Sequence, residues 1–359
     1  MNIKNIFLNA VWALIALTAC SSDDKPVYPE PPVYDMSGFA KGADVSWLTE
    51  MEKAGNKFYN SLGRETECMT LLRDLGMNSI RLRVWVNPVD GWCNKGDVLV
   101  KAWRAKNLGM RVMINFHYSD TWADPGKQYM PAAWEGLSLE ELKTAVADHT
   151  KEVLNALKEK GITPEWVQVG NETSNGFLWE MGQADKNPAQ YAALFAAGYE
   201  AAKSVFPDTK VIVHLDSGYD NDLYNWNLDI LKNNGAKWDM IGMSLYPYWA
   251  MSNGQETSSE KVITDCIDNI KKVSTKYDCD VMIVETGMEC ADDDGKLAAA
   301  TVLAEGKTML GRIIQECREN TNGRCKGVFY WEPQCKPSKY RLGAFTEDGY
   351  PTVIMDAFK

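Results

Sequence analysis

The sequence of 359 residues is poor in the side chains on which several large classes of protein depend. It has three histidines, His117, His149 and His214, and no two lie three or four residues apart, which argues against a helical histidine site for zinc. It has no CxxC pair, so zinc-ribbon and thioredoxin-like chemistry are disfavoured. Lys and Arg number 38 against 49 Asp and Glu, a net charge of −11. Nucleic acid is therefore disfavoured as a partner, because it requires a positive surface.

Long apolar runs are also lacking, and the one at the N-terminus is short. Residues 1–20 read MNIKNIFLNAVWALIALTAC, in which the apolar stretch is too short to span a bilayer and fits a signal peptide. The stretch ends in LTAC, which resembles a lipobox, so we expect residues 1–19 to be removed and Cys20 to be lipidated. An ordinary signal peptide with an incidental cysteine is the alternative.

Residues 20–37 are acidic and then rich in proline, which predicts an extended tether. The acidic run directly after Cys20 resembles the surface-export signal of some Gram-negative lipoproteins. We therefore expect an outer-membrane lipoprotein that is exposed at the cell surface and contacts the membrane only through its N-terminal lipid. We also expect it to be a monomer. The other eight cysteines are free to pair as disulfides in an oxidising compartment, in an order that their spacing leaves open.

Short apolar runs alternate with helical stretches from residue 38 to residue 359. Eight runs rich in Val and Ile fit buried parallel strands, at 39–46, 78–85, 111–118, 165–170, 210–215, 240–246, 279–286 and 326–331. The clearest helix is expected to begin after Ser138, with Glu141 completing a capping box, and to end at Gly161. This order predicts one (β/α)8 barrel. A doubly wound open sheet is the alternative, but GADVSW (42–47) is not the expected GxGxxG turn.

Tryptophan is abundant, with 13 residues, and its distribution is uneven. Seven lie at or soon after the end of a predicted strand, where the functional loops of such barrels are found: Trp47, Trp85, Trp122, Trp134, Trp179, Trp249 and Trp331. A flat ring matches the apolar face of a pyranose, and neighbouring Asp, Asn and His side chains bind its hydroxyls. The pattern therefore indicates a saccharide cleft.

Two glutamates end predicted strands and face a cost if they are buried. Glu172 ends WVQVGNE on the fourth strand, and Glu285 ends VMIVE on the seventh. Burying a charge costs several kcal/mol unless it is compensated, so stability alone is a poor reason for either position. A pair of carboxylates across a sugar cleft is what glycoside hydrolysis requires, whereas a structural ion pair with Arg81 or Arg83 is the competing interpretation. Spacing alone does not say which glutamate is the acid.

Several segments together resemble the endo-β-1,4-galactanases of glycoside hydrolase family 53, in clan A of retaining barrels. The segments are GADVSWLTEME (42–52), RLRVWVNP (81–88), INFHYSDTWADPGKQYMPAAW (114–134), VQVGNET (167–173), GMSLYPYW (242–249) and IVETG (283–287). The resemblance implies Glu172 as the acid/base and Glu285 as the nucleophile. It also implies that Tyr246 holds the nucleophile and that an arginine on the second strand keeps it ionised. The substrate-binding residues that we predict are Asp44, Arg81, Arg83, Trp85, His117, Trp122, Asp124, Asn171, Tyr246, Trp249 and Trp331.

The expected substrate is a neutral β-1,4-galactan, such as the side chains of pectin or type I arabinogalactan, and no cofactor is required for the chemistry. A calcium site in the loop after the seventh strand is implied by several bacterial relatives, with Asp292 and Asp294 as candidate ligands. A solvated turn, or a disulfide between Cys290 and Cys335 that braces the loop, is the alternative. Two other functions stay open: another clan A endo-glycanase, such as a β-mannanase or endoglucanase, and a non-catalytic glycan-binding lipoprotein.

Overall fold

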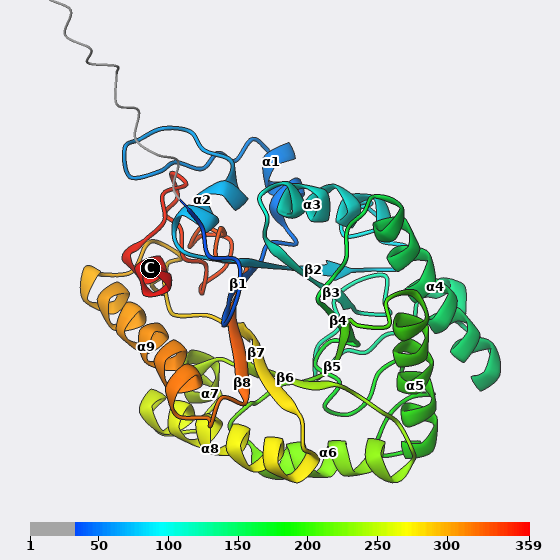
Figure 1. Ribbon diagram of the computed structural model, residues 1–359. Coiled ribbons are helices and arrows are strands. Elements are labelled where there is room, and N and C mark those ends of the chain that lie inside the picture. The colour runs from blue at the N-terminus through cyan, green and yellow to red at the C-terminus, as the bar shows by residue number, and fades with distance from the viewer. Residues whose placement is uncertain (1–32) are drawn as a thin grey trace, which may run out of the picture. The chain divides into compact units, whose positions relative to one another are not determined.

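The computed structural model describes residues 33–359, of which Tyr34–Lys359 form one compact unit (Figure 1). Eight parallel strands close into a barrel in sequence order, and β8 pairs with β1. The predicted (β/α)8 barrel is thus confirmed and the open sheet is excluded. The predicted signal peptide and the predicted lipidation site, Cys20, lie outside the described residues. Residues 34–37, which we placed in the tether, belong to this unit, and the Tyr34 hydroxyl donates to Asp74 Oδ1 at 2.6 Å.

Seven of the eight strands fall within the apolar runs that predicted them, and β8 begins one residue before its run, at Cys325. They are β1 (Ala40–Asp44), β2 (Ser79–Val84), β3 (Arg111–Phe116), β4 (Trp166–Val169), β5 (Lys210–Leu215), β6 (Met240–Leu245), β7 (Asp280–Thr286) and β8 (Cys325–Trp331). Most of their residues are buried on both faces, because the interior of the barrel lies on one side and the helices on the other.

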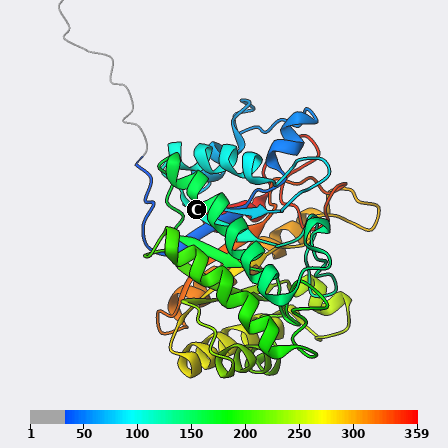
Figure 2. The same ribbon diagram turned by 90° about the vertical axis from the view of Figure 1, so that its right-hand side faces the viewer.

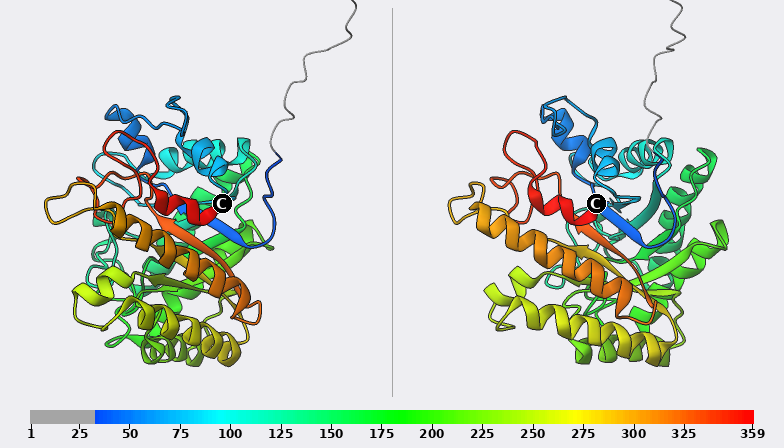
Figure 3. Two further views of the ribbon diagram at one scale, coloured as in Figure 1. Left: turned by 90° about the vertical axis from the view of Figure 1, so that its left-hand side faces the viewer. Right: turned by 60° about the vertical axis from the view of Figure 1, so that its left-hand side comes forward.

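Helices surround the barrel. They are α1 (Leu48–Lys53), α2 (Cys68–Asp74), α3 (Lys95–Asn107), α4 (Leu139–Glu159), α5 (Pro188–Val205), α6 (Asn221–Asn233), α7 (Pro247–Ser252), α8 (Ser259–Tyr277) and α9 (Ala300–Glu319), with 3₁₀ turns η1 (Ala132–Trp134) and η2 (Val353–Phe358). The capping box of Ser138 and Glu141 starts α4 as predicted. Figure 2 shows α4 and α5 side by side, and Figure 3 shows the C-terminal η2 against α9. None of the helices between residues 33 and 359 is long and apolar enough to cross a membrane.

The interior of the barrel is filled in layers. At the amino ends of the strands, an apolar plug fills the space, built from Ala40, Met113, Trp166, Ile212, Met240, Met282, Val284 and Phe329. The rings of Trp166 and Phe329 meet edge to face at 6.0 Å. Gly42 makes room for Phe329, since a Cβ at that position would lie 2.2 Å from the ring. The plug closes this end, so any site must open at the carboxyl end of the barrel.

One extra residue in β7 changes which way its last side chains point. Met243 pairs with Ile283 but the next residue, Ser244, pairs with Glu285, so Val284 is bulged out of the register. Ile283 belongs to the outer core while Val284 belongs to the interior plug. Under strict alternation Glu285 would then face outward. The bulge lets two successive side chains point inward and so brings Glu285 into the barrel.

The eight cysteines between residues 33 and 359 are all buried and free. The disulfides that the sequence left open, including the alternative pair Cys290 and Cys335, are therefore absent from this part of the chain. The thiol of Cys335 instead packs against Met51 of α1, with 4.0 Å between the two sulfur atoms. These cysteines act as small apolar side chains in the core.

Candidate active site

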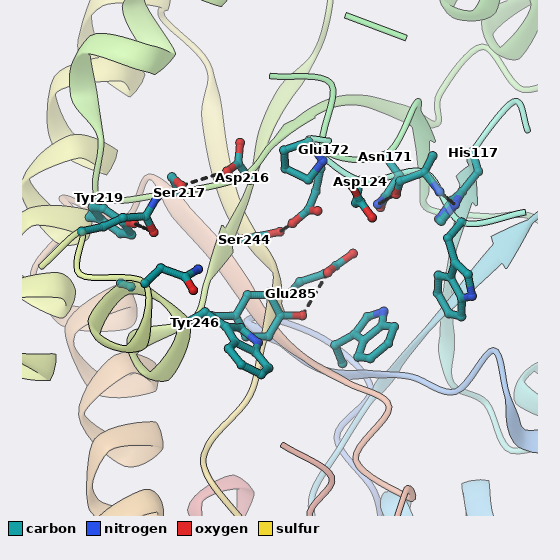
Figure 4. A pocket seen from close by; sticks show the side chains of 18 of the residues that line it. His117, Asp124, Asn171, Glu172, Asp216, Ser217, Tyr219, Ser244, Tyr246 and Glu285 are labelled. Atoms are coloured by element: carbon teal, nitrogen blue, oxygen red, sulfur yellow. Dashed lines mark hydrogen bonds between the residues drawn. The ribbon is translucent and has the colours of Figure 1, made fainter. Parts of the chain in front are cut away.

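A cavity of about 480 Å³ opens at the carboxyl ends of the strands, where the barrel places function (Figure 4). It is lined by residues from the ends of β3 to β8 and from the loops that follow them. Of the predicted substrate-binding residues, seven line it: His117, Trp122, Asp124, Asn171, Tyr246, Trp249 and Trp331. Both Glu172 and Glu285 also line it. The two glutamates, 113 residues apart in sequence, therefore share one cleft.

Glu285 faces a cation and a hydroxyl. Its Oε1 lies 2.8 Å from Nη1 of Arg81, and its Oε2 accepts a hydrogen bond from Tyr246 at 3.0 Å. The guanidinium of Arg81 is fully buried and is held by Asp44 at 2.8 Å and by Asn171 at 3.0 Å. Arg81 is therefore the second-strand arginine that meets the predicted nucleophile.

Glu172 is surrounded differently, because no cation contacts its carboxyl group among the described residues. Its Oε1 accepts a hydrogen bond of 2.6 Å from Ser244, a residue of β6 (Figure 4). Burial raises the pKa of Glu172 well above its usual value, and the negative charges of Glu285, Asp216 and Asp124 raise it further. This carboxyl group is thus the one that retains a proton.

The two environments separate the pair into an acid and a base. Burial raises the pKa of Glu285 too, but the charge of Arg81 and the hydrogen bond from Tyr246 oppose that rise. Because the two carboxyl groups repel each other when both are ionised, the one with the cation loses its proton first. These surroundings favour Glu285 as the carboxylate and Glu172 as the carboxylic acid.

The other four predicted substrate-binding residues do not line the cavity: Asp44, Arg81, Arg83 and Trp85. Asp44 and Arg81 are fully buried and bind each other. Arg83 pairs with buried Glu332 at 3.3 Å, and its guanidinium lies over the rings of Trp122 and Trp85 at 4.1 and 4.8 Å. Arg83 therefore supports the tryptophans from behind, whereas Arg81, held by Asp44, contacts the Glu285 carboxylate.

The aromatic wall is a cluster of edge-to-face rings. Trp122 packs against Trp47 and Trp85 at 5.2 Å and against Trp331 at 5.8 Å. Tyr340 completes it, 4.8 Å from Trp331. The indole of Trp85 also donates to Nδ1 of His117 at 3.3 Å. Such interlocked rings cannot rotate independently, so they present a rigid apolar surface to a ligand.

The cavity also contains residues that the sequence analysis missed: Asp216, Ser217, Tyr219, Ser244, Asn253, Gln255 and Tyr340. Asp216 and Ser217 directly follow β5, and burial raises the pKa of Asp216. The sequence carried a signal for both residues, because they end the apolar run KVIVHLDS (210–217) as Glu172 ends the run on the fourth strand. Tyr340 and Gln255 lie far from any strand end and carry no such signal.

The loop after β7 does not fit the calcium ion that the resemblance implies. Oδ1 of Asp292 accepts hydrogen bonds from the backbone N–H groups of Asp294 and Lys296 at 3.0 and 2.8 Å. The side chain of Asp294 lies 3.3 Å from Lys296, and that of Asp293 lies 2.9 Å from Arg341. Within residues 33–359, no group of three or more His, Cys, Asp or Glu side chains is placed to hold a metal ion. The aspartates form a turn whose charges are balanced by basic side chains.

The chain is similar in sequence to proteins that are named as galactanases. The profile of glycosyl hydrolase family 53 matches residues 40–352. An endo-beta-1,4-galactanase of Bacillus subtilis is 32% identical over 318 residues, covering 83% of this chain and 71% of that protein. An arabinogalactan endo-beta-1,4-galactanase of Thermothelomyces thermophilus is 32% identical over 305 residues, covering 82% and 89%.

Solved structures agree with the sequence relatives. The GH53 catalytic domain of Ignisphaera aggregans superposes with a TM-score of 0.79 at 30% identity, covering 92% of this chain and 97% of that one. Xylanase 10B of Thermotoga maritima, at 16% identity and a TM-score of 0.59 over 90% and 94% of the two chains, shares the fold alone. A profile that spans nearly the whole barrel and a relative of this identity and coverage lead to one assignment. The chain belongs to glycosyl hydrolase family 53.

Proposed function

We propose that the protein hydrolyses internal β-1,4-galactosidic bonds of galactan with retention of configuration. The observation that carries the proposal is the pair Glu172 and Glu285, which share one cleft but have opposite electrostatic surroundings. Two relatives are named for endo action on β-1,4-galactan or arabinogalactan, which supports the substrate.

In the first step, the Glu285 carboxylate attacks C1 of the galactosyl unit and the bond from C1 to the glycosidic oxygen breaks. The proton of Glu172 passes to the leaving oxygen, which leaves an ester between the sugar and Glu285. In the second step, water attacks C1, Glu172 takes the proton from that water, and the ester bond breaks. Arg81 and Tyr246 stabilise the Glu285 carboxylate at the start and end of the cycle.

The cleft suits a long neutral chain. Trp122, Trp249 and Trp331 supply apolar surfaces for galactose rings, while His117 and Asp124 offer polar atoms for hydroxyl groups. Burial and the charges of Arg83 and Arg81 hold the pKa of His117 well below its usual value. Its ring is therefore neutral and carries a hydrogen on only one of its two nitrogens. Its Nδ1 accepts from Trp85 and from the backbone of Ala123, so its hydrogen is on Nε2.

The test is a time course of products from linear β-1,4-galactan, with mannan and cellulose in parallel. We expect a mixture of galacto-oligosaccharides at the earliest times and the β-anomer as the first product by NMR. Release of galactose alone would contradict endo action. A faster reaction on mannan or cellulose would show that one of these, and not galactan, is the substrate. If none of the three released reducing sugar, the protein would be a glycan-binding protein without catalytic activity.

We also propose that the enzyme is a monomeric lipoprotein at the outer surface of a Gram-negative bacterium, on the basis of LTAC (17–20) and the acidic tether. Labelled fatty acid should enter the protein and be lost in Cys20→Ser. Protease added to intact cells should digest the wild-type protein if it faces outward. Resistance to the protease would place it on the periplasmic side.

A further inference from the structure

A line of buried hydrogen bonds runs beneath Glu172 and joins residues of four strands. Ser244 Oγ, on β6, lies 2.6 Å from Glu172 Oε1 and 2.9 Å from Nε2 of His214 on β5. Nδ1 of His214 lies 2.6 Å from the side-chain amide nitrogen of Gln168 on β4. The last member is Arg81, whose Nε donates to Oε1 of Gln168 at 3.1 Å. His214, Gln168 and Ser244 are 2% exposed or less, so bulk water does not compete for these bonds.

The line has a fixed direction, because it begins at a group that can only donate. Arg81 holds the amide oxygen of Gln168 and so turns the NH2 group toward Nδ1 of His214. Nδ1 must then be the acceptor, and the hydrogen of the neutral ring is on Nε2, which donates to Ser244. The hydroxyl hydrogen of Ser244 is left for Oε1 of Glu172.

A second contact supports the same tautomer. Glu172 adopts a left-handed backbone conformation, with φ of 46°, which a residue with a side chain rarely adopts without compensation. Its backbone N–H donates to Nδ1 of His214 at 3.2 Å. A backbone N–H cannot accept, so Nδ1 is again an acceptor. His214 thus binds the backbone of Glu172 directly and its carboxyl group through Ser244.

We propose that Ser244 and His214 are positioning residues that keep Oε1 of Glu172 hydrogen-bonded throughout the cycle and the acidic proton on Oε2. This inference rests on the proposed function, because it concerns the residue that donates the proton. Oε2 has no protein partner among the described residues, so it is the oxygen available to a glycosidic bond. The hydrogen of Ser244 stays on its own oxygen in both steps, and only the proton on Oε2 moves.

The charged groups around Glu172 are Glu285 from β7, Asp216 from the end of β5 and Asp124 from the loop after β3, all of which favour the protonated form. Ser244 acts in the opposite sense, because a donor stabilises the carboxylate. Replacing Ser244 with alanine should therefore raise the pKa of Glu172. The basic limb of the profile of kcat/KM against pH, which reports loss of the acid, should move upward by about one pH unit.

The first experiment compares Ser244→Ala with the wild type on two kinds of substrate. On galactan, where the leaving group needs a proton, kcat/KM should fall by about 10- to 100-fold. On a 2,4-dinitrophenyl galactobioside, whose leaving group needs none, it should change little. Ser244→Thr should restore the galactan rate and the pH limb, since it returns a hydroxyl. Ser79→Ala is the matched control, a buried serine at the amino end of β2.

An equal loss on both substrates, or a basic limb that does not move, would overturn the proposal. A measurement on the unmodified protein covers the case in which Ser244→Ala does not fold. Nitrogen NMR of the ring of His214, assigned by difference with His214→Gln, should show a hydrogen on Nε2 and none on Nδ1 across the pH range of activity. A hydrogen on Nδ1 would overturn the proposal whatever the enzyme hydrolyses, whereas inactivity on galactan would overturn only the proposed function.

Discussion

The two ends of the barrel interior are built from opposite materials. At the amino end, the inward-facing residues are apolar and include Phe329, Trp166 and Met240. At the carboxyl end, the next inward positions carry Arg81, Gln168 and His214, all of them fully buried. Two strands supply both layers with residues only two positions apart, Trp166 and Gln168 on β4 and Ile212 and His214 on β5.

This difference shows where stability and chemistry are each obtained. Rings in the plug gain free energy simply by leaving water. Buried charges such as Arg81 and Asp44 are costly to desolvate, and they persist because each is paired and hydrogen-bonded. The amino end therefore stabilises a barrel whose carboxyl end is electrostatically demanding.

The comparison predicts its largest effect at Glu285. Glu285→Gln should lower kcat on galactan by on the order of 10⁴-fold, because the amide cannot form the ester intermediate. The melting temperature should not fall, since a buried carboxyl group is removed. Glu305→Gln, at an exposed position of α9, is the control. Substantial activity in Glu285→Gln would contradict its role as nucleophile.

Arg81→Met should damage both properties at once. It leaves Asp44 and Glu285 without their cation, which costs about 3–5 kcal/mol of stability. Because the positive charge lowers the pKa of Glu285, its loss raises that pKa. The acid limb of kcat/KM should therefore shift to higher pH.

Arg111→Met, at the amino end of β3, removes an arginine that pairs with Glu165 and covers Trp166. It should lower the melting temperature less than Arg81→Met and leave the acid limb in place. If the acid limb shifted equally in Arg81→Met and Arg111→Met, the two ends of the barrel would not differ in their effect on catalysis.

Phe329→Ala should affect stability alone. Removing a fully buried ring from the plug leaves a cavity and costs about 3–5 kcal/mol in chemical denaturation. The folded fraction should keep the wild-type pH profile, because Phe329 does not line the catalytic cavity. A changed profile would show that the plug also positions the site.

A histidine outside the barrel interior extends the comparison to pH. Burial lowers the pKa of His149 to about 4, where it packs among Phe116, Tyr118 and Trp134. The unfolded chain binds a proton at about pH 6.5, so the stability due to neutral His149 is present above that pH and is lost as pH falls toward 4. Between pH 7 and pH 5 the loss should be about 2 kcal/mol. In His149→Phe the free energy of unfolding should fall by about 2 kcal/mol less than in the wild type between pH 7 and pH 5.

The smallest effect is expected at the loop after β7. Arg341 contacts Glu289 and Asp293 and covers Tyr248, but the pairs are partly exposed. Arg341→Ala should cost less than about 1 kcal/mol. EDTA should not change the melting temperature of the wild type. A melting temperature that rises with added calcium would contradict the charge-balanced turn. For Arg341→Ala, the control is Arg324→Ala, which also removes a surface arginine from an ion pair.

Local patterns were enough to predict the repeating elements and the two glutamates. Apolar runs placed the strands, and the capping box placed the start of α4, because these features depend on near neighbours. The pattern could not choose between Arg81 and Arg83, since both point inward and only tertiary packing puts Arg83 beneath the tryptophans. It also missed Ser244, whose importance depends on a histidine from another strand.

The bulge at Val284 decides which way the side chain of Glu285 points. If β7 kept all of its residues but ran in strict alternation, the carboxylate of Glu285 would point toward the helices, with every active-site side chain still encoded. Insertions in the loops would only lengthen them. Loop length is therefore free to vary, whereas a transplanted or designed version of the site must reproduce the bulge in β7 along with its residues, because the residues alone do not set the direction of the nucleophile.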